Sequence, residues 1–295
     1  MKHSTSENLG QALVLCLMTV FLALTLYPLV HVLFASVSEP TRLVAHRGPI
    51  LAPLGLSMQP FELLFGNPFV LGGLVNSALL IIGGVSANIV MTAIAAYVLS
   101  KRYARLVKGF TVFIIFTMLF SGGLVPFYLV IKGMGLYNSY LALILPFAIN
   151  TFNLIILRTA FEGVPASLDE SARMDGAGHF TILFRITIPL VMPMIAVMIL
   201  YYAVERWNGW FYASVFLKDK TLYPLQLVLR ELLMVNDAGA MAAGNDSADL
   251  MMLSQSIKYA AIVVGTLPVL AFYPFLQRWF IRGGLAGAVT DCGPL

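Results

Sequence analysis

Long apolar runs separated by short polar segments make up most of this chain. The apolar runs occupy residues 10–36, 69–99, 109–131, 138–160, 183–204 and 258–280. An α-helix needs about 20 apolar residues to cross a bilayer, whereas a membrane β-strand alternates in polarity over about ten. The pattern therefore predicts an all-α polytopic membrane protein with six transmembrane helices.

Helix-weakening residues interrupt some of these runs. Gly122, Gly123 and Pro126 lie in the third run, where we expect a break in the helix. A proline after two glycines frees backbone groups, and these must then be satisfied by other partners. We expect the fifth helix to run through Pro189 and Pro193 into the membrane. Glycine pairs in the second run favour close contact between helices, at residues 72–73 and 83–84.

The composition supports a membrane protein. Of the 295 residues, 59% are hydrophobic and 11% are charged, whereas soluble domains carry about 25% charged residues. Six spans and their loops use nearly all of the length, so we expect no separate soluble domain. The predicted division is a first transmembrane helix and outer loop at 1–68, a transmembrane core at 69–282 and a tail at 283–295. The first run is too long for a signal-peptide core, so we expect it to be retained.

The net charge of +4 reflects topology rather than binding to nucleic acid. Basic residues cluster at the ends of the apolar runs: residues 101–108 contain four of them, and residues 158–185 and the C-terminal end contain more. The positive-inside rule places these segments and both termini on the cytoplasmic side. Residues 37–68 and 205–257 are then outer loops.

The sequence offers no candidate for catalysis or for a metal site. The four histidines are not at metal-ligand spacing from one another or from the two cysteines. Cys16 lies inside a predicted span and Cys292 lies in the tail, too far apart in depth for a disulfide. No glycine-rich phosphate loop ends in Lys-Ser or Lys-Thr, so we expect no cofactor on this chain and no ATP bound by that route.

Polar residues inside the predicted spans are uncharged. Ion-coupled carriers usually need an ionisable residue deep in a span, and the centres of the six runs contain none. The asparagine amides can bind sugar hydroxyls or hold helices together, and the tryptophans can stack on a sugar or form an aromatic belt at the membrane interface. Both pairs of alternatives stay open at this point. The candidate pathway residues are Asn88, Asn150, Asn153, Trp207, Asn208 and Trp210.

A charged segment, VPASLDESARMDGAGHFTILFRITIPLVMP at residues 164–193, separates two apolar runs. It is too rich in charge to lie in lipid. Pro165 suits a first helical position, Asp169 and Glu170 suit the early turns, and Gly176 suits a helix end. We therefore expect a short amphipathic helix at about 166–175. From these residues alone, an ordinary helix resting on the headgroups is an equal alternative.

The motif residues of this segment resemble a known loop. Glu170-Ser171-Ala172 and Asp175-Gly176-Ala177, followed by Phe184, Ile186, Pro189 and Pro193, resemble the Glu-Ala-Ala loop of type I ABC importer permeases, with Ser171 in place of the middle alanine. Residues 121–161 and 207–232 are similar to the carbohydrate branch of that family. The resemblance covers most of the chain from residue 69 onward.

This resemblance implies a transport subunit. Residues 162–183 would form a cytoplasmic coupling loop between helices 4 and 5 and contact a separate ATPase. The coupling residues would be Glu170, Ser171, Ala172, Asp175, Gly176 and Ala177. The chain would form half of a pore for an oligosaccharide in a bacterial inner membrane.

The resemblance also implies partners. These are a second homologous permease, two ATPase subunits that carry the ATP and Mg²⁺, and an extracytoplasmic solute-binding protein. A rival interpretation is an ATP-independent carrier or channel for a polar uncharged solute. The charge of the oligosaccharide stays open, because the outer basic residues lie next to acidic ones.

Overall fold

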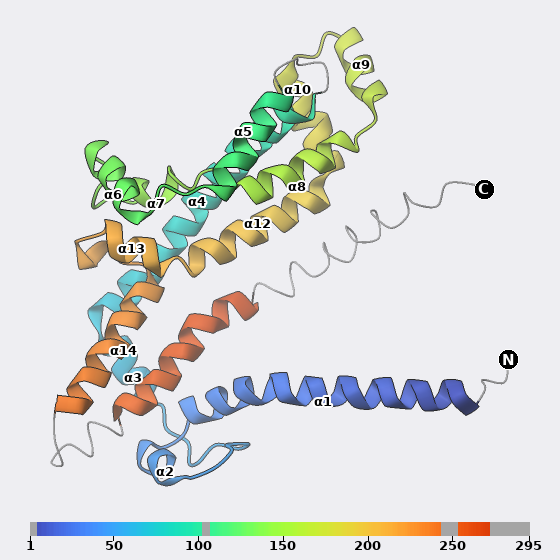
Figure 1. The fold of residues 1–295 in the computed structure, drawn as a ribbon. Helices are drawn as coiled ribbons and strands as arrows, with labels where there is room; N and C mark the ends of the chain where they lie inside the picture. Colours follow the sequence, from blue (N-terminus) through green and yellow to red (C-terminus); the bar gives the residue numbers. More distant parts are fainter. Residues whose placement is uncertain (1–4, 102–106, 243–252, 272–295) are drawn as a thin grey trace. The chain divides into compact units, whose positions relative to one another are not determined.

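The computed structural model describes residues 5–101, 107–242 and 253–271, and these are mostly helical (Figure 1). The chain forms two compact units, Met1–Val70 with Leu229–Leu267 and Leu71–Val228 with Pro268–Leu295. The predicted all-helical class is confirmed for the described residues, where one isolated bridge between Ser38 and Leu56 is the only strand-like pairing.

The first unit contains a long apolar helix and a small core. Helix α1, Thr5–Ser36, is continuous through Pro28, as the first apolar run predicts. The short helices α2, Pro40–Ala45, and α3, Gln59–Gly66, follow it. Ala35, Leu43 and Ile50 form an apolar cluster, and the Ile50 N–H donates to His31 Nδ1 at 3.4 Å.

Helix α4, Pro68–Ser100, is continuous despite its two glycine pairs. A Cβ at Gly73 would lie 3.1 Å from the Leu225 Cα atom, so this glycine permits a close backbone approach. The expected close packing is therefore confirmed at Gly73. The last described helix, Leu253–Ala271, covers the start of the sixth apolar run, and residues 272–280 of that run lie outside the described residues.

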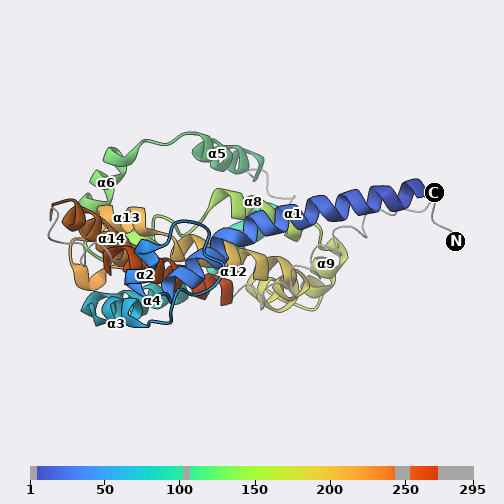
Figure 2. The same cartoon turned by 90° about the horizontal axis from the view of Figure 1, so that it is seen from below.

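The third apolar run breaks where the sequence predicts. Helix α5, Val107–Leu119, and helix α6, Leu124–Gly133, are bent by 114° to one another (Figure 2). Gly123 lies between them with φ of +83°, a left-handed conformation that costs glycine little. The expected break at Gly122–Pro126 is confirmed.

The fourth run does not form the single helix that its hydropathy predicts. A short helix α7, Leu141–Ile144, is separated from α8, Thr151–Glu162, by the segment around Pro146. Pro146 has no N–H for a continuous helix, and the Asn150 side chain accepts from the N–H groups of Phe152 and Asn153, which starts a new one.

The fifth run also departs from its prediction. Helix α10, His179–Ile182, continues as a π-helix at Leu183–Thr187 and as α11, Ile188–Leu190. The chain then bends by 88° before α12, Met192–Trp207. A helix running through both prolines is therefore wrong, because Pro193 lies in the first turn of a new helix, where its missing N–H costs nothing.

The predicted outer loop at 205–257 contains regular structure in its described part. Helix α13, Trp210–Phe216, a 3₁₀ turn at Lys220–Leu222 and helix α14, Leu225–Ala242, follow α12. Across the described residues, three helices are long and apolar enough to cross a membrane, or five when each bent pair is one span. The described helices therefore provide at most five membrane spans rather than the predicted six, because the fourth apolar run is split between α7 and α8.

Candidate functional site

Helix α9, Ala166–Met174, ends in a turn that favours glycine. Gly176 has φ of +78°, its N–H donates to the Arg173 carbonyl at 3.0 Å, and the Ala177 N–H donates to the Ala172 carbonyl at 2.9 Å. These two bonds form a Schellman motif. The predicted helix and its end at Gly176 are confirmed, whereas Pro165 is the N-cap rather than the first helical residue.

Asp169 holds α9 to the end of α4. Its Oδ1 accepts from Lys101 Nζ at 2.8 Å and from the Tyr97 hydroxyl at 3.4 Å, and its Oδ2 lies 3.2 Å from Arg173 Nη2. Burial of the Asp169 carboxylate raises its pKa, but the hydrogen bonds and positive charges of Lys101 and Arg173 outweigh that effect and leave the pKa below its ordinary value. The carboxylate is therefore charged and paired at neutral pH.

The six predicted coupling residues lie together on α9 and its end, but they face two environments. Glu170, Ser171, Asp175 and Gly176 are exposed. Ala172 is 8% exposed and belongs to an apolar cluster with buried residues of α4, α8, α10 and α12, and Ala177 packs against the same cluster. The burial of Ala172 in that cluster packs α9 against this chain.

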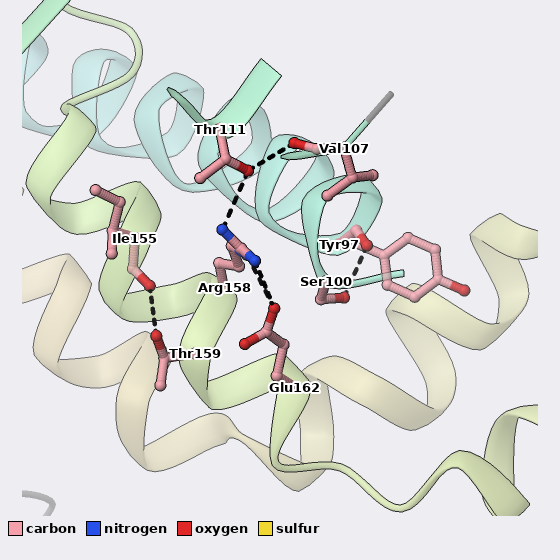
Figure 3. A network of polar contacts seen from close by, with 8 residues as sticks. All are labelled: Tyr97, Ser100, Val107, Thr111, Ile155, Arg158, Thr159 and Glu162. Atoms are coloured by element: carbon pink, nitrogen blue, oxygen red, sulfur yellow. Dashed lines mark hydrogen bonds and ion pairs between the residues drawn. The ribbon is translucent and has the colours of Figure 1, made fainter. Parts of the chain in front are cut away.

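Arg158, near the end of α8, makes hydrogen bonds that link α8 to α5 (Figure 3). Its Nε lies 2.9 Å from Glu162 Oε1, and its Nη1 donates to Thr111 Oγ1 at 3.1 Å. The Thr111 hydroxyl donates in turn to the Val107 carbonyl at 2.8 Å. Because Glu162 is the last residue of α8, this network fixes the point where the chain leaves that helix toward α9.

A second polar cluster lies at the middle of α4. Asn88 is 1% exposed, and its Nδ2 donates to the Phe147 carbonyl at 3.0 Å. Arg206, in the last turn of α12, donates from Nη2 to Asn88 Oδ1 and to the Phe147 carbonyl, both at 3.1 Å, and from Nη1 to the Leu143 carbonyl. The carbonyls of Leu143, in α7, and of Phe147, between α7 and α8, therefore receive hydrogen bonds from side chains of α4 and α12.

Tyr202 completes this cluster one turn from Arg206. Its hydroxyl lies 2.7 Å from Thr92 Oγ1 and accepts from the Asn150 N–H at 3.1 Å. Asn150 and the buried Asn153 thus lie at the start of α8, beside the polar cluster that contains Asn88. The structure brings these three predicted asparagines into one region, where Asn88 and Asn150 each make hydrogen bonds within the chain.

The remaining predicted pathway residues lie at the junction of α12 and α13. Trp207 is buried and lines an apolar groove of about 620 Å³ between α4 and α12. Asn208 is exposed, and its Nδ2 donates to the Val204 carbonyl at 3.0 Å. Trp210 begins α13 and meets Phe211 edge to face, with 5.7 Å between ring centroids.

This chain is similar to known proteins in sequence and in fold. The family model for "Binding-protein-dependent transport system inner membrane component" matches residues 81–284. The chain belongs to this family. It is 37% identical to the polygalacturonan/rhamnogalacturonan transport system permease protein YtcP of Bacillus subtilis (strain 168), over 96% of this chain and 99% of that one. It is 38% identical to Protein LplC of the same bacterium, over 90% of each chain.

A solved structure has the same fold. One chain in the crystal structure of a bacterial ABC transporter involved in the import of the acidic polysaccharide alginate matches with a TM-score of 0.84 and 30% identity, over 95% of this chain and 99% of that one. The family comprises permease subunits of ABC transporters, which are not themselves enzymes. Its apolar helices make this permease a membrane protein.

Sequence reasoning missed Arg206 as a central residue of the permease. It lies two residues beyond the fifth apolar run and next to Glu205, which suggested an outer-face charge. A signal was present in the second run: a Cβ at Gly84 would lie 3.2 Å from Arg206 Nε, so this glycine makes room for the guanidinium. Sequence alone does not pair positions 84 and 206, because the contact is tertiary.

Proposed function

We propose that this permease forms half of the translocation pore of an ATP-driven importer for an oligosaccharide. The observation that carries the proposal is α9, a short polar helix held to its own chain by Ala172 and Asp169 while Glu170 and Asp175 stay exposed. An anchored helix with an outward charged face suits transmission of force from a partner. Family membership supports this interpretation.

The proposed assembly contains four further subunits. Two ATPase subunits that bind ATP and Mg²⁺ meet α9 at the cytoplasmic face, a second permease completes the pore, and a solute-binding protein docks on the outer face. In this arrangement both termini are cytoplasmic, the chain crosses a bacterial inner membrane six times, and the core is residues 69–282 with a tail at 283–295. The basic segments at 101–108 and 158–185 support this orientation.

The six motif residues divide into two proposed tasks. Glu170, Ser171, Asp175 and Gly176 meet the ATPase, where Glu170 attracts a basic residue of the partner. Ala172 and Ala177 hold the base of α9 against the permease. The burial of Ala172 and the exposure of Glu170 support this division of the coupling loop at 162–183.

The predicted pathway residues also divide. We propose that Asn88, Asn150 and Asn153 shape the wall of the pathway, since the first two make hydrogen bonds within the chain. Trp207 has an apolar setting and supports the same wall. Asn208 and Trp210 are the proposed solute contacts at the outer end, because an exposed amide and an indole can bind hydroxyls and stack on a sugar ring.

Oligosaccharide fragments of acidic polysaccharides are the proposed substrate class. The support comes from the relative that transports polygalacturonan and rhamnogalacturonan and from the structural neighbour that imports the acidic polysaccharide alginate. The test is uptake of labelled oligogalacturonate, alginate trisaccharide and maltotriose by proteoliposomes containing the complete complex. The proposal predicts ATP-dependent uptake of an acidic oligosaccharide. Uptake by the permeases alone, without the ATPase, would favour the carrier instead.

A further inference from the structure

Helix α4 makes polar contacts at three levels along its length. It contains 33 residues and has no proline after its first position, so it is about 50 Å long at 1.5 Å per residue. At one end it meets α9, at the middle it meets α12 and the segment between α7 and α8, and toward the other end it meets the segment before α14. A continuous helix that contacts three elements moves all three contacts together.

At the first level, Lys101 and Tyr97 at the end of α4 contact Asp169 of α9. Lys101 Nζ lies 2.8 Å from Asp169 Oδ1, and the two side chains are 18% and 17% exposed. The same ammonium lies 4.3 Å from the centroid of the Tyr97 ring, whose hydroxyl also reaches Asp169. A paired charge shielded by an aromatic ring is held more firmly than an exposed surface pair.

At the second level, Asn88 and Thr92 of α4 join the polar cluster around Arg206. Asn88 donates to the Phe147 carbonyl and accepts from Arg206, while Thr92 bonds the Tyr202 hydroxyl at 2.7 Å. These contacts join α4 to α12 and to the non-helical segment before α8.

At the third level, Asn76 and Ser77 hold the chain that leads into α14. Asn76 Nδ2 donates to the carbonyls of Thr221 and Tyr223, at 2.7 and 3.0 Å. The Leu225 N–H donates to Ser77 Oγ at 2.8 Å, beside the close approach at Gly73. The polar side chains are buried at the second and third levels and partly buried at the first, so each level resists sliding of α4 against its neighbours.

We infer that α4 transmits a displacement of α9 to the polar cluster around Arg206. The Lys101–Asp169 pair is the positioning contact that couples the movement of α9 to α4. This inference rests on the proposed function, because it assumes that ATPase subunits move α9. Lys101 and Asp169 act through α4 and touch neither ATP nor solute. Their loss weakens the contact between α9 and α4, so that α9 moves further than α4 does.

The test is the number of solute molecules imported per ATP hydrolysed by the complete complex in proteoliposomes. Asp169→Asn and Lys101→Met keep the complex assembled and hydrolysing ATP, but import per ATP falls by about fivefold or more, the lower range of a typical coupling between sites. Lys101→Arg keeps the charge and preserves the ratio. Thr159→Ala, an exposed position on α8 outside this contact and outside the coupling loop, is the control and leaves the ratio unchanged.

The charge-reversed double variant, Lys101→Asp with Asp169→Lys, recovers part of the ratio lost in the single variants. An unchanged ratio in both single variants overturns the inference. So does a parallel loss of assembly, hydrolysis and import, since the pair then serves folding alone. Failure of the proposed function is distinct, because in that case the wild-type complex shows no ATP-dependent import at all.

Discussion

The guanidinium of Arg206 donates to Asn88 Oδ1 at 3.1 Å, joining the end of α12 to the middle of α4. The same group also donates to the carbonyl of Leu143 in α7 and to that of Phe147 between α7 and α8. A buried carbonyl without a donor is costly, and a chain in a membrane has no water in the bilayer core to supply one. The apolar fourth run is therefore able to break because Arg206 and Asn88 supply its missing donors.

Arg206→Met removes the donor from Asn88 Oδ1 and from the Leu143 carbonyl. We expect the free energy of unfolding to fall by roughly 1.5–3 kcal/mol, the range for hydrogen bonds to charged groups. Arg206→Lys keeps the positive charge but loses the planar guanidinium with its several donors. The stability of this variant should therefore lie between those of the wild type and Arg206→Met. Thermal unfolding of the detergent-solubilised complex measures this. A methionine variant as stable as the wild type would show that these hydrogen bonds contribute nothing.

Gly176→Ala places a side chain in the left-handed conformation that ends α9. No atom lies within 4 Å of the added Cβ, so the expected cost, about 1–2 kcal/mol, is backbone strain alone. Gly178→Ala is the matched control, because Gly178 also has open space but a φ of −77°. Proteolysis of the α8–α10 connection reports the loss of order. Equal sensitivity of the two variants would contradict the strain argument.

Acid should loosen α9 through Asp169. The folded-state pKa of Asp169 lies below its unfolded value, because Lys101 and Arg173 stabilise the charged form against the cost of burial. Its contribution to stability is therefore complete above the ordinary carboxylate pKa of about 3.9 and is lost as the pH falls through the lower folded-state value.

The pH dependence of unfolding in wild type and Asp169→Asn measures this effect. The stability difference between the two proteins should shrink as the solution is acidified below about pH 4. A difference that is constant through the acid range would mean that the charge of Asp169 does not stabilise the fold.

Sequence predicted those parts of the fold that local chemistry determines. Helices α1 and α4 follow from unbroken apolar runs, the bend before α6 follows from Gly123, and the end of α9 follows from Gly176. Hydropathy failed at the fourth and fifth runs, because a sliding window does not register a side-chain cap at Asn150 or a helix restarted at Pro193.

The candidate site shows the same division between local and tertiary information. Asp169 and Glu170 are adjacent in sequence, and the pattern gave both the same place in the early turns of α9. The structure separates them, since Asp169 pairs with Lys101 whereas Glu170 stays exposed. That difference depends on the end of α4, 68 residues away in the chain, and no local pattern contains it.

The most direct test of the account is ATP-driven uptake of an acidic oligosaccharide by the reconstituted complex carrying Glu170→Lys, with Thr159→Ala on α8 as the control. Glu170 is the exposed acid through which α9 is proposed to meet the ATPase, so reversing its charge should lower both copurification of the ATPase and uptake by about tenfold or more, while the control matches the wild type. Uptake and ATPase association that are unchanged in Glu170→Lys would contradict the coupling role of α9.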